Sequence, residues 1–177
     1  MKPKKCKVCK QTYTPQRQLQ QVCSPLCGIK YTKKQKEKAW KKEKAEKKKE
    51  LMTLQDWVKI AQATFNTYIR LNDKELNNPC ISCRKPLGTK YDAGHFFNAN
   101  NHWNLRFDER NVHSQCVYCN RHLHGNLLEY RNQLESYYGA NWLTELEKDA
   151  KITRKFTIEE VKEINELYKN KIKNLKK

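Results

Sequence analysis

All eight cysteines of this chain fall in four closely spaced pairs, and this pattern limits what the chain can fold into. The pairs are Cys6 with Cys9, Cys23 with Cys27, Cys80 with Cys83, and Cys116 with Cys119. Cysteines this close in sequence rarely form a disulfide with each other, whereas two such pairs supply the four thiolates of a tetrahedral zinc site. The spacing therefore predicts two structural Zn²⁺ sites, one for the first two pairs and one for the last two.

The low hydrophobic content argues against one large apolar core, so metal ions should take its place, and the expected helices and short hairpin predict a small α+β fold. Only 37% of the 177 residues are hydrophobic. We expect a zinc finger over residues 1–28, a Lys/Glu-rich helical arm or linker over residues 29–52, and a larger domain over residues 53–177. The finger has few apolar residues, so metal binding should supply most of its folding free energy. It can serve as a docking finger for DNA or protein, or as a purely structural cap.

The charge of the chain is strongly positive and lies mainly in its first part. The formal net charge is +18, and residues 1–50 hold 17 lysines and arginines against 4 glutamates. Such an excess favours a polyanionic partner, with DNA as the first candidate. An anionic membrane is set aside because the basic stretch lacks a broad apolar face. A formed helix could place many lysines along phosphates, but a charged run is also typical of a solvated linker.

The cysteine pattern and the lack of long apolar runs indicate in which cellular compartment the protein works. No apolar segment at the N-terminus resembles a signal peptide, and no run approaches membrane-spanning length. Thiols that bind zinc require reducing conditions. We therefore expect a protein of the cytoplasm.

Periodicity and capping signals place the helices. Thr53 is an expected N-cap for an amphipathic helix that gives way to a loop at Asn72 and Asp73. Thr157 and Glu160 form a capping-box pattern that opens the last helix. Between these helices, we expect strands over residues 90–92 and 105–107 around a long loop, and helices from Cys119 onward that are interrupted at Gly139.

Polar residues suited to metal binding and proton transfer gather around the second pair of cysteine motifs. They are Asp92, His95, Asn111, His113, Asn120, His122 and His124. The order of strand, long loop, Asn, cysteine pair and helix resembles the HNH endonuclease, or ββα-metal, motif. More closely, the chain resembles the NinG (Rap) family of lambdoid phage recombination proteins, in the runs Trp57-Val-Lys-Ile-Ala-Gln, Pro79-Cys-Ile-Ser-Cys, Asp92-Ala-Gly-His, Leu105-Arg-Phe, Glu109-Arg-Asn-Val-His and Gln115-Cys-Val-Tyr-Cys-Asn.

The HNH resemblance implies roles for some of these residues. His95 matches the general base, Asn111 matches the residue that holds the loop and orients that base, and Asn120 matches the metal ligand on the helix. The ion would be Mg²⁺ or Mn²⁺ with oxygen ligands, and histidine ligation would widen the choice toward Zn²⁺, Ni²⁺ or Co²⁺.

The chain departs from the common motif immediately before the base. Gly94 stands where many relatives carry a metal-binding His or Asp. Asp92 is the expected strand ligand in its place, because residues 92 and 94 point to the same side of a strand. His124 and His122 compete for a further metal position, and His113 could cap the zinc knuckle or contact phosphate.

The family resemblance implies an enzyme that cuts branched DNA. The expected activity is metal-dependent hydrolysis of Holliday junctions and D-loops by a phage protein in its bacterial host, and paired cuts would suit a homodimer. A non-catalytic zinc-finger DNA-binding accessory protein would explain the cysteines and the charge equally well. A sequence-specific HNH nuclease of the homing or restriction type is a second enzyme alternative. The sequence assigns no individual residue to DNA binding.

Overall fold

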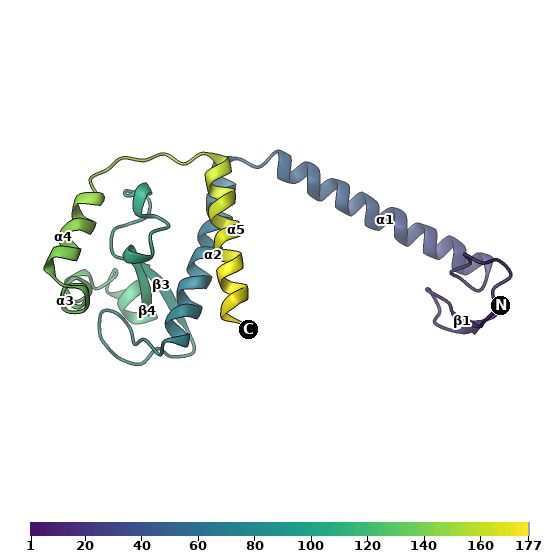
Figure 1. Ribbon diagram of the computed structural model, residues 1–177, viewed down its shortest axis with the longest axis horizontal. Coiled ribbons are helices and arrows are strands. Elements are labelled where there is room, and N and C mark those ends of the chain that lie inside the picture. Colours follow the sequence, from purple (N-terminus) through teal and green to yellow (C-terminus); the bar gives the residue numbers. More distant parts are fainter. Residues whose placement is uncertain (177) are drawn as a thin grey trace. The chain divides into compact units, whose positions relative to one another are not determined.

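The computed structural model describes residues 1–176, and the chain divides into two compact units, Met1–Met52 and Thr53–Lys177 (Figure 1). Each unit carries one of the two small sheets. Each also carries one of the two cysteine clusters. The predicted α+β class with two cysteine clusters is therefore confirmed.

The first unit is a hairpin finger continued by one long helix. Strands β1 (Lys4–Lys5) and β2 (Thr12–Tyr13) pair antiparallel, and helix α1 spans Pro25–Glu50. Ser24 caps α1 by accepting a hydrogen bond from the Cys27 amide, and Pro25 suits the first turn because its nitrogen needs no partner there. The helix thus begins before residue 29, where the arm was expected, so Cys27 lies within its first turn.

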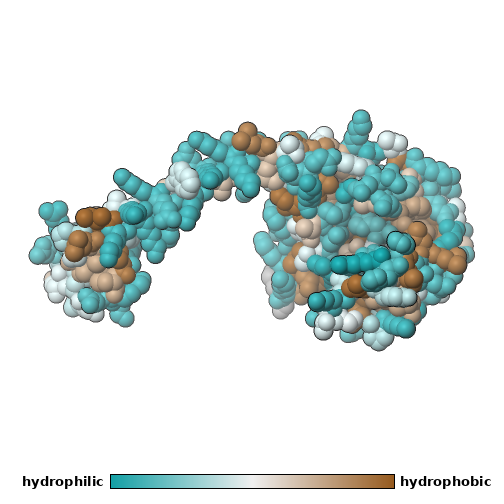
Figure 2. Space-filling view, turned by 180° about the vertical axis from the view of Figure 1, so that it is seen from behind, coloured by the Kyte–Doolittle hydropathy of each residue, from teal (hydrophilic) through white to brown (hydrophobic). Residues whose placement is uncertain are grey.

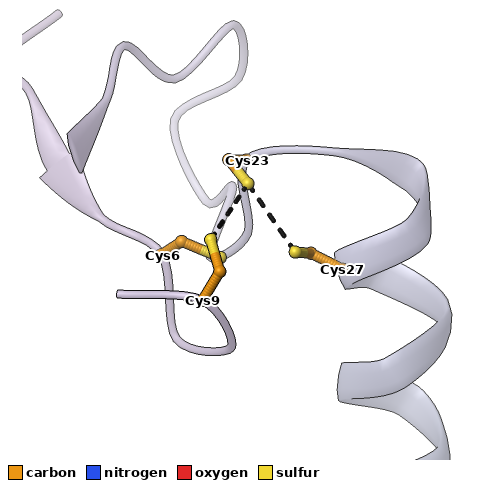
Figure 3. A group of neighbouring side chains, drawn as sticks. All are labelled: Cys6, Cys9, Cys23 and Cys27. Carbon is orange, nitrogen blue, oxygen red and sulfur yellow. Dashed lines mark hydrogen bonds between the residues drawn. The ribbon is translucent and has the colours of Figure 1, made fainter. Parts of the chain in front are cut away.

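The four sulfurs of the first unit face one another from the finger and the helix (Figure 3). The Cys23 sulfur lies 3.5 Å from that of Cys9 and 3.7 Å from that of Cys27. Zinc–sulfur bonds of about 2.3 Å in a tetrahedron place sulfurs about 3.8 Å apart, so the cluster fits zinc. Within residues 1–52, only Cys6 and Pro15 are buried. An apolar core is therefore lacking, and a metal ion bound by the four cysteines would be the main source of stability of this unit.

The second unit is built on two neighbouring helices, α2 (Leu54–Glu75) and α5 (Ile158–Leu175) (Figure 1). Both predicted N-caps are confirmed: Thr53 forms a capping box with Asp56, as Thr157 does with Glu160. Aromatic residues fill the core between the helices, where the Phe65 ring meets Tyr168 edge-on.

The loop predicted at Asn72 and Asp73 is wrong, because α2 continues to Glu75. Asp73 is only 7% exposed, and its carboxylate accepts hydrogen bonds from the Ser114 amide at 2.7 Å and the Asn78 side chain at 3.0 Å. These bonds compensate the burial of the charge within the helix. A tertiary contact therefore overrides the local turn signal.

The sheet of the second unit pairs β3 (Tyr91–His95) antiparallel with β4 (Val112–Cys116). The strand predicted at residues 105–107 is wrong: short 3₁₀ turns occupy Trp103–Leu105 and Glu109–Asn111. Leu105 and Phe107 are buried, and the Phe107 ring packs against the rings of Phe65 and Phe156. The apolar alternation at 105–107 thus marks a loop that fills the core.

The chain after β4 forms the other side of the second unit. A π-helical turn spans Tyr118–His122, followed by α3 (Leu127–Tyr138) and α4 (Ala140–Asp149). The predicted interruption at Gly139 is confirmed, and its φ of +88° is a conformation that favours glycine. A second small core joins α3 and α4 to the loop before β3 through Ile81, Tyr130, Leu134 and Leu143.

The second cysteine cluster connects this loop with the end of the sheet. The sulfurs of Cys80, Cys83, Cys116 and Cys119 all lie within 4.8 Å of one another, and Cys83 is 3.9 Å from Cys116. This spacing also fits a tetrahedral zinc ion. Among residues 1–176, no helix is long and apolar enough to cross a bilayer.

Gly94 and Gln115 interlock on one face of the sheet. A Cβ atom at position 94 would lie 1.9 Å from the Gln115 Oε1 atom and 2.7 Å from its Cδ atom. The Gln115 side chain cannot easily move, because its Nε2 atom donates to the Ser82 hydroxyl and the Gly125 carbonyl, each at 2.6 Å. Position 94 therefore requires glycine for close approach.

Serine substitution in each cluster should separate the two zinc sites. We expect the wild type to hold two zinc ions, and Cys83→Ser and Cys27→Ser to hold one each. Cys83→Ser should unfold the second unit, whereas Cys27→Ser should leave its melting transition unchanged. Metal analysis and thermal melts of the full chain check this, and two zinc ions in Cys83→Ser would contradict it.

Gly94→Ala should destabilise the second unit by about 1–3 kcal/mol, the usual range for inserting a methyl group into a filled space. The matched control is Gly88→Ala, where no atom lies within 4 Å of the added Cβ. Urea denaturation compares the free energies of unfolding. Equal values for the two variants would show that Gln115 yields to the extra atom.

Candidate functional site

The predicted site residues fall on opposite faces of the β3–β4 sheet. Side chains alternate along a strand, so Ala93 and His95 share one face, and Asp92 and Gly94 share the other. Ala93 packs against the core formed with α2 and α5. Hydrogen bonds of Asp92 run instead to the π-helical turn after β4.

His95 is held at the end of β3 by the long loop. Its Nε2 atom lies 3.2 Å from the Arg106 carbonyl oxygen and 3.4 Å from the Gln62 Nε2 atom. A carbonyl oxygen only accepts, so the shorter contact is a hydrogen bond when Nε2 carries the proton. That tautomer leaves the lone pair on Nδ1. Burial lowers the pKa of His95, and the positive charge of Arg106 lowers it further, against the opposing effect of the hydrogen bond to the Arg106 carbonyl.

Asn111 holds both ends of this loop. The residue is fully buried, and its Oδ1 atom accepts from the Phe97 amide at 2.7 Å. Its Nδ2 group donates to the carbonyls of Phe97 at 2.9 Å and Leu105 at 3.1 Å. Because Arg106 follows Leu105, these hydrogen bonds also fix the position of the Arg106 carbonyl, which binds His95.

Arg106 supports the same arrangement, although no motif in the sequence singled it out for this. It is 7% exposed, and its Nη atoms donate to Gln62 Oε1 at 3.2 Å and Asn100 Oδ1 at 2.9 Å. Its guanidinium lies 5.1 Å from the centroid of the Trp103 ring. Burial lowers the pKa of this guanidinium. Its place in the run Leu105-Arg-Phe, which also carries the family resemblance, is the sequence signal that could have found it.

On the other face, Asp92 lies beside Asn120, the residue that the resemblance implied as a metal ligand. The Asn120 amide nitrogen donates to Asp92 Oδ2 at 3.0 Å. Arg121, which no sequence pattern singles out, donates to both oxygens of the same carboxylate at 2.7 and 2.8 Å. These donors lower the pKa of Asp92, with the hydrogen bonds from Arg121 as the largest cause.

The oxygen donors of Asp92 and Asn120 suit a hard divalent cation, provided that Arg121 leaves the carboxylate. Gly94 contributes no ligand. His122 and His124 are exposed, and His124 has a left-handed φ of +50°. Asn120 and His124 were expected one turn apart, on condition that an α-helix had already begun at Asn120. The π-helical turn ends at His122 instead, so no continuous α-helix connects these two residues.

His113 lies between two tyrosines, on the same face as Asp92. Its Nδ1 atom is 2.9 Å from the Tyr130 hydroxyl, which donates to the Gly94 carbonyl at 3.0 Å, and its Nε2 atom is 3.4 Å from the Tyr138 hydroxyl. Burial lowers the pKa of His113 to about 4, so the ring is neutral near pH 7. These contacts do not match the expected roles of knuckle cap or phosphate contact. Through Tyr130, His113 is instead linked to the Gly94 carbonyl on the strand that carries His95.

Comparison with known proteins identifies the family. The family described as "Bacteriophage Lambda NinG protein" matches residues 1–177. The chain is 35% identical to Protein ninG of Escherichia phage 933W, over 98% of this chain and 94% of the relative. It is 37% identical to Protein ninG of Salmonella phage P22 and of Escherichia phage lambda, over 95% of this chain and 90% of each relative. No solved structure matches the chain. A match of this extent, in both the family and its curated relatives, means that the chain belongs to the NinG family of bacteriophage proteins.

Proposed function

We propose that this protein is a metal-dependent DNA endonuclease that hydrolyses phosphodiester bonds in branched recombination intermediates such as Holliday junctions and D-loops. The observation that carries the proposal is the buried Asn111 clamp, which brings the Arg106 carbonyl onto the imidazole of His95. A purely structural zinc module has no need for an imidazole with one nitrogen bound by backbone and the other left with its lone pair.

His95 acts as the general base in this mechanism. With Nε2–H bound to Arg106, the Nδ1 lone pair accepts a proton from a water molecule lined up on the scissile phosphorus. The lowered pKa keeps the imidazole unprotonated near pH 7, as this role requires. Asn111 is a positioning residue, because it touches the loop and not the reacting atoms.

Asp92 and Asn120 are the residues that would hold Mg²⁺ or Mn²⁺. When bound, such an ion would supply electrostatic stabilisation of the phosphate and of the leaving 3′ oxygen. Because these ligands lie on the opposite face of β3 from His95, the substrate would have to contact both faces of the strand. Arg121, once displaced from Asp92, has two guanidinium donors that suit a phosphate oxygen. The expected products are 5′-phosphate and 3′-hydroxyl ends, as the HNH resemblance implies.

A non-catalytic DNA-binding accessory protein is the competing function. It accounts for both cysteine clusters and for the excess of lysine. It gives no reason for the His95 and Asn111 arrangement or for an aspartate beside Asn120. A second copy of the chain would supply the second active site that paired cuts of a four-way junction need.

His95→Ala should remove cleavage while leaving folding and binding intact. We expect the rate of junction cutting to fall about 10²–10⁴-fold, the usual contribution of a general base. Labelled four-way junction and matched linear duplex are incubated with wild type and variant, with Mg²⁺, with Mn²⁺ and with EDTA. Zinc content and junction binding are the controls. Cutting by His95→Ala at the wild-type rate would contradict the assignment of the base, and tight binding with no cutting by wild type would favour the accessory function.

The pH dependence of cleavage should show a base with a lowered pKa. Only unprotonated His95 accepts the proton, so the rate rises with pH through its pKa and is flat above it. Because burial lowers that pKa, the midpoint should fall below 6.5, the usual value for histidine. Rate profiles in Mg²⁺ and in Mn²⁺ show which group titrates. If the group is His95, the midpoint pH is the same with both metals, whereas the midpoint pH of a metal-bound water differs between them.

A further inference from the structure

A groove of about 600 Å³ lies where the finger of the first unit meets helix α1. Its cationic lining consists of Lys7, Lys10, Lys30, Lys34 and Lys38. Tyr31 lies among them, and no acidic residue lines the groove. We call this feature the lysine groove.

The two walls of the lysine groove are held together by the first cysteine cluster. One wall is the knuckle between Cys6 and Cys9, and the other is the start of α1, where Cys27 belongs to the same cluster. The Tyr31 hydroxyl also donates to Gln21 Oε1 at 2.7 Å, and the Lys7 ammonium lies 5.9 Å from the centroid of the Tyr31 ring. Zinc binding would therefore preform the groove.

The lysines of the groove follow one face of α1. Lys30, Lys34 and Lys38 are four residues apart, so successive side chains lie about 40° apart around the helix. Glu43, Glu46 and Glu50 lie about 120–180° around the helix from Lys34. Glu37 is closer to the lysine face, but it pairs with Lys41 at 2.8 Å. The glutamates of α1 therefore do not neutralise the positive charge of the lysine groove.

No residue of α1 is buried in the first unit, and hydrophilic residues cover the helix in Figure 2. A helix that packs on its own unit would show a buried apolar stripe, which α1 lacks. Its 26 residues span about 39 Å, slightly more than one turn of duplex DNA. The helix is thus long enough to carry lysines along a nucleic-acid backbone beyond the groove itself.

We propose that the lysine groove binds the phosphodiester backbone of DNA. The proposal rests on the proposed function in that DNA is the ligand. Five ammonium groups without a carboxylate repel one another until an anion neutralises them, and each lysine can contact a phosphate without reading a base. The groove therefore adds affinity for any DNA sequence, as a protein that acts on branched DNA needs.

Two double substitutions on the same helix test the groove. Lys34→Gln with Lys38→Gln removes two charges from the groove. Lys36→Gln with Lys47→Gln removes two from the opposite side of α1, outside the groove lining. Binding to a labelled four-way junction is measured by fluorescence anisotropy between 50 and 200 mM salt, without Mg²⁺ or Mn²⁺. Circular dichroism and zinc content confirm that both variants fold.

The groove variant should bind about 10-fold more weakly at 100 mM salt, with a slope of log K against log salt that is about 1.8 smaller in magnitude. The control variant should stay within about 2-fold of wild type. Equal weakening of both variants would overturn the proposal, because attraction would then come from total charge. Wild-type binding by both would also overturn it. A groove variant that loses binding to poly-glutamate but binds DNA like the wild type would overturn the proposal as well.

Cleavage by the wild type separates this proposal from the proposed nuclease. If the wild type cuts the junction in Mg²⁺ but the groove variant binds DNA normally, the groove proposal fails and the nuclease stands. If the wild type never cuts but the groove variant alone loses binding, the nuclease fails and the groove stands.

Discussion

The cluster of Cys80, Cys83, Cys116 and Cys119 is the constraint on which the second unit depends. A two-stranded hairpin is marginal in water, and β3–β4 has only five residues in each strand. The cluster joins the loop before β3 to the end of β4 and to the turn that follows. A bound zinc ion would therefore keep the two strands in register at the end opposite to His95. At that opposite end, the buried Asn111 takes over, because its three hydrogen bonds close the loop between the strands.

Between these two ends, the sheet separates two chemically different environments. On the α2 side, burial and the neighbouring Arg106 favour a neutral imidazole at His95. On the other side, Arg121 and Asn120 favour a charged carboxylate at Asp92. In the proposed nuclease, a neutral His95 and an ionised Asp92 are the protonation states that a general base and a metal ligand need near pH 7. One pair of strands thus carries both groups without bringing their side chains into contact.

Features set by local chemistry could be predicted from the sequence, whereas features set by distant partners could not. Thr53, Thr157 and Gly139 act within a few residues of themselves, and all three predictions are confirmed. The second strand was misplaced because apolar alternation looks the same in a strand and in a loop that fills a core. Asp73 was predicted in a loop because its partner, the Ser114 amide, lies 41 residues away. Arg121 was missed because adjacency to Asn120 carries no periodic signal, and only the fold brings it to Asp92.

In the proposed nuclease, packing explains why the chain departs from the common HNH pattern at Gly94. The space that a side chain at position 94 would enter is filled by Gln115, which is held by Ser82 and Gly125. A metal ligand at position 94 would therefore require the loss of that buried packing. Asp92 lies two residues earlier on the same face, and it already contacts Asn120. In the proposed nuclease, a carboxylate at position 92 therefore keeps a metal ligand on the face of the π-helical turn, while Gly94 leaves the interior of the sheet filled.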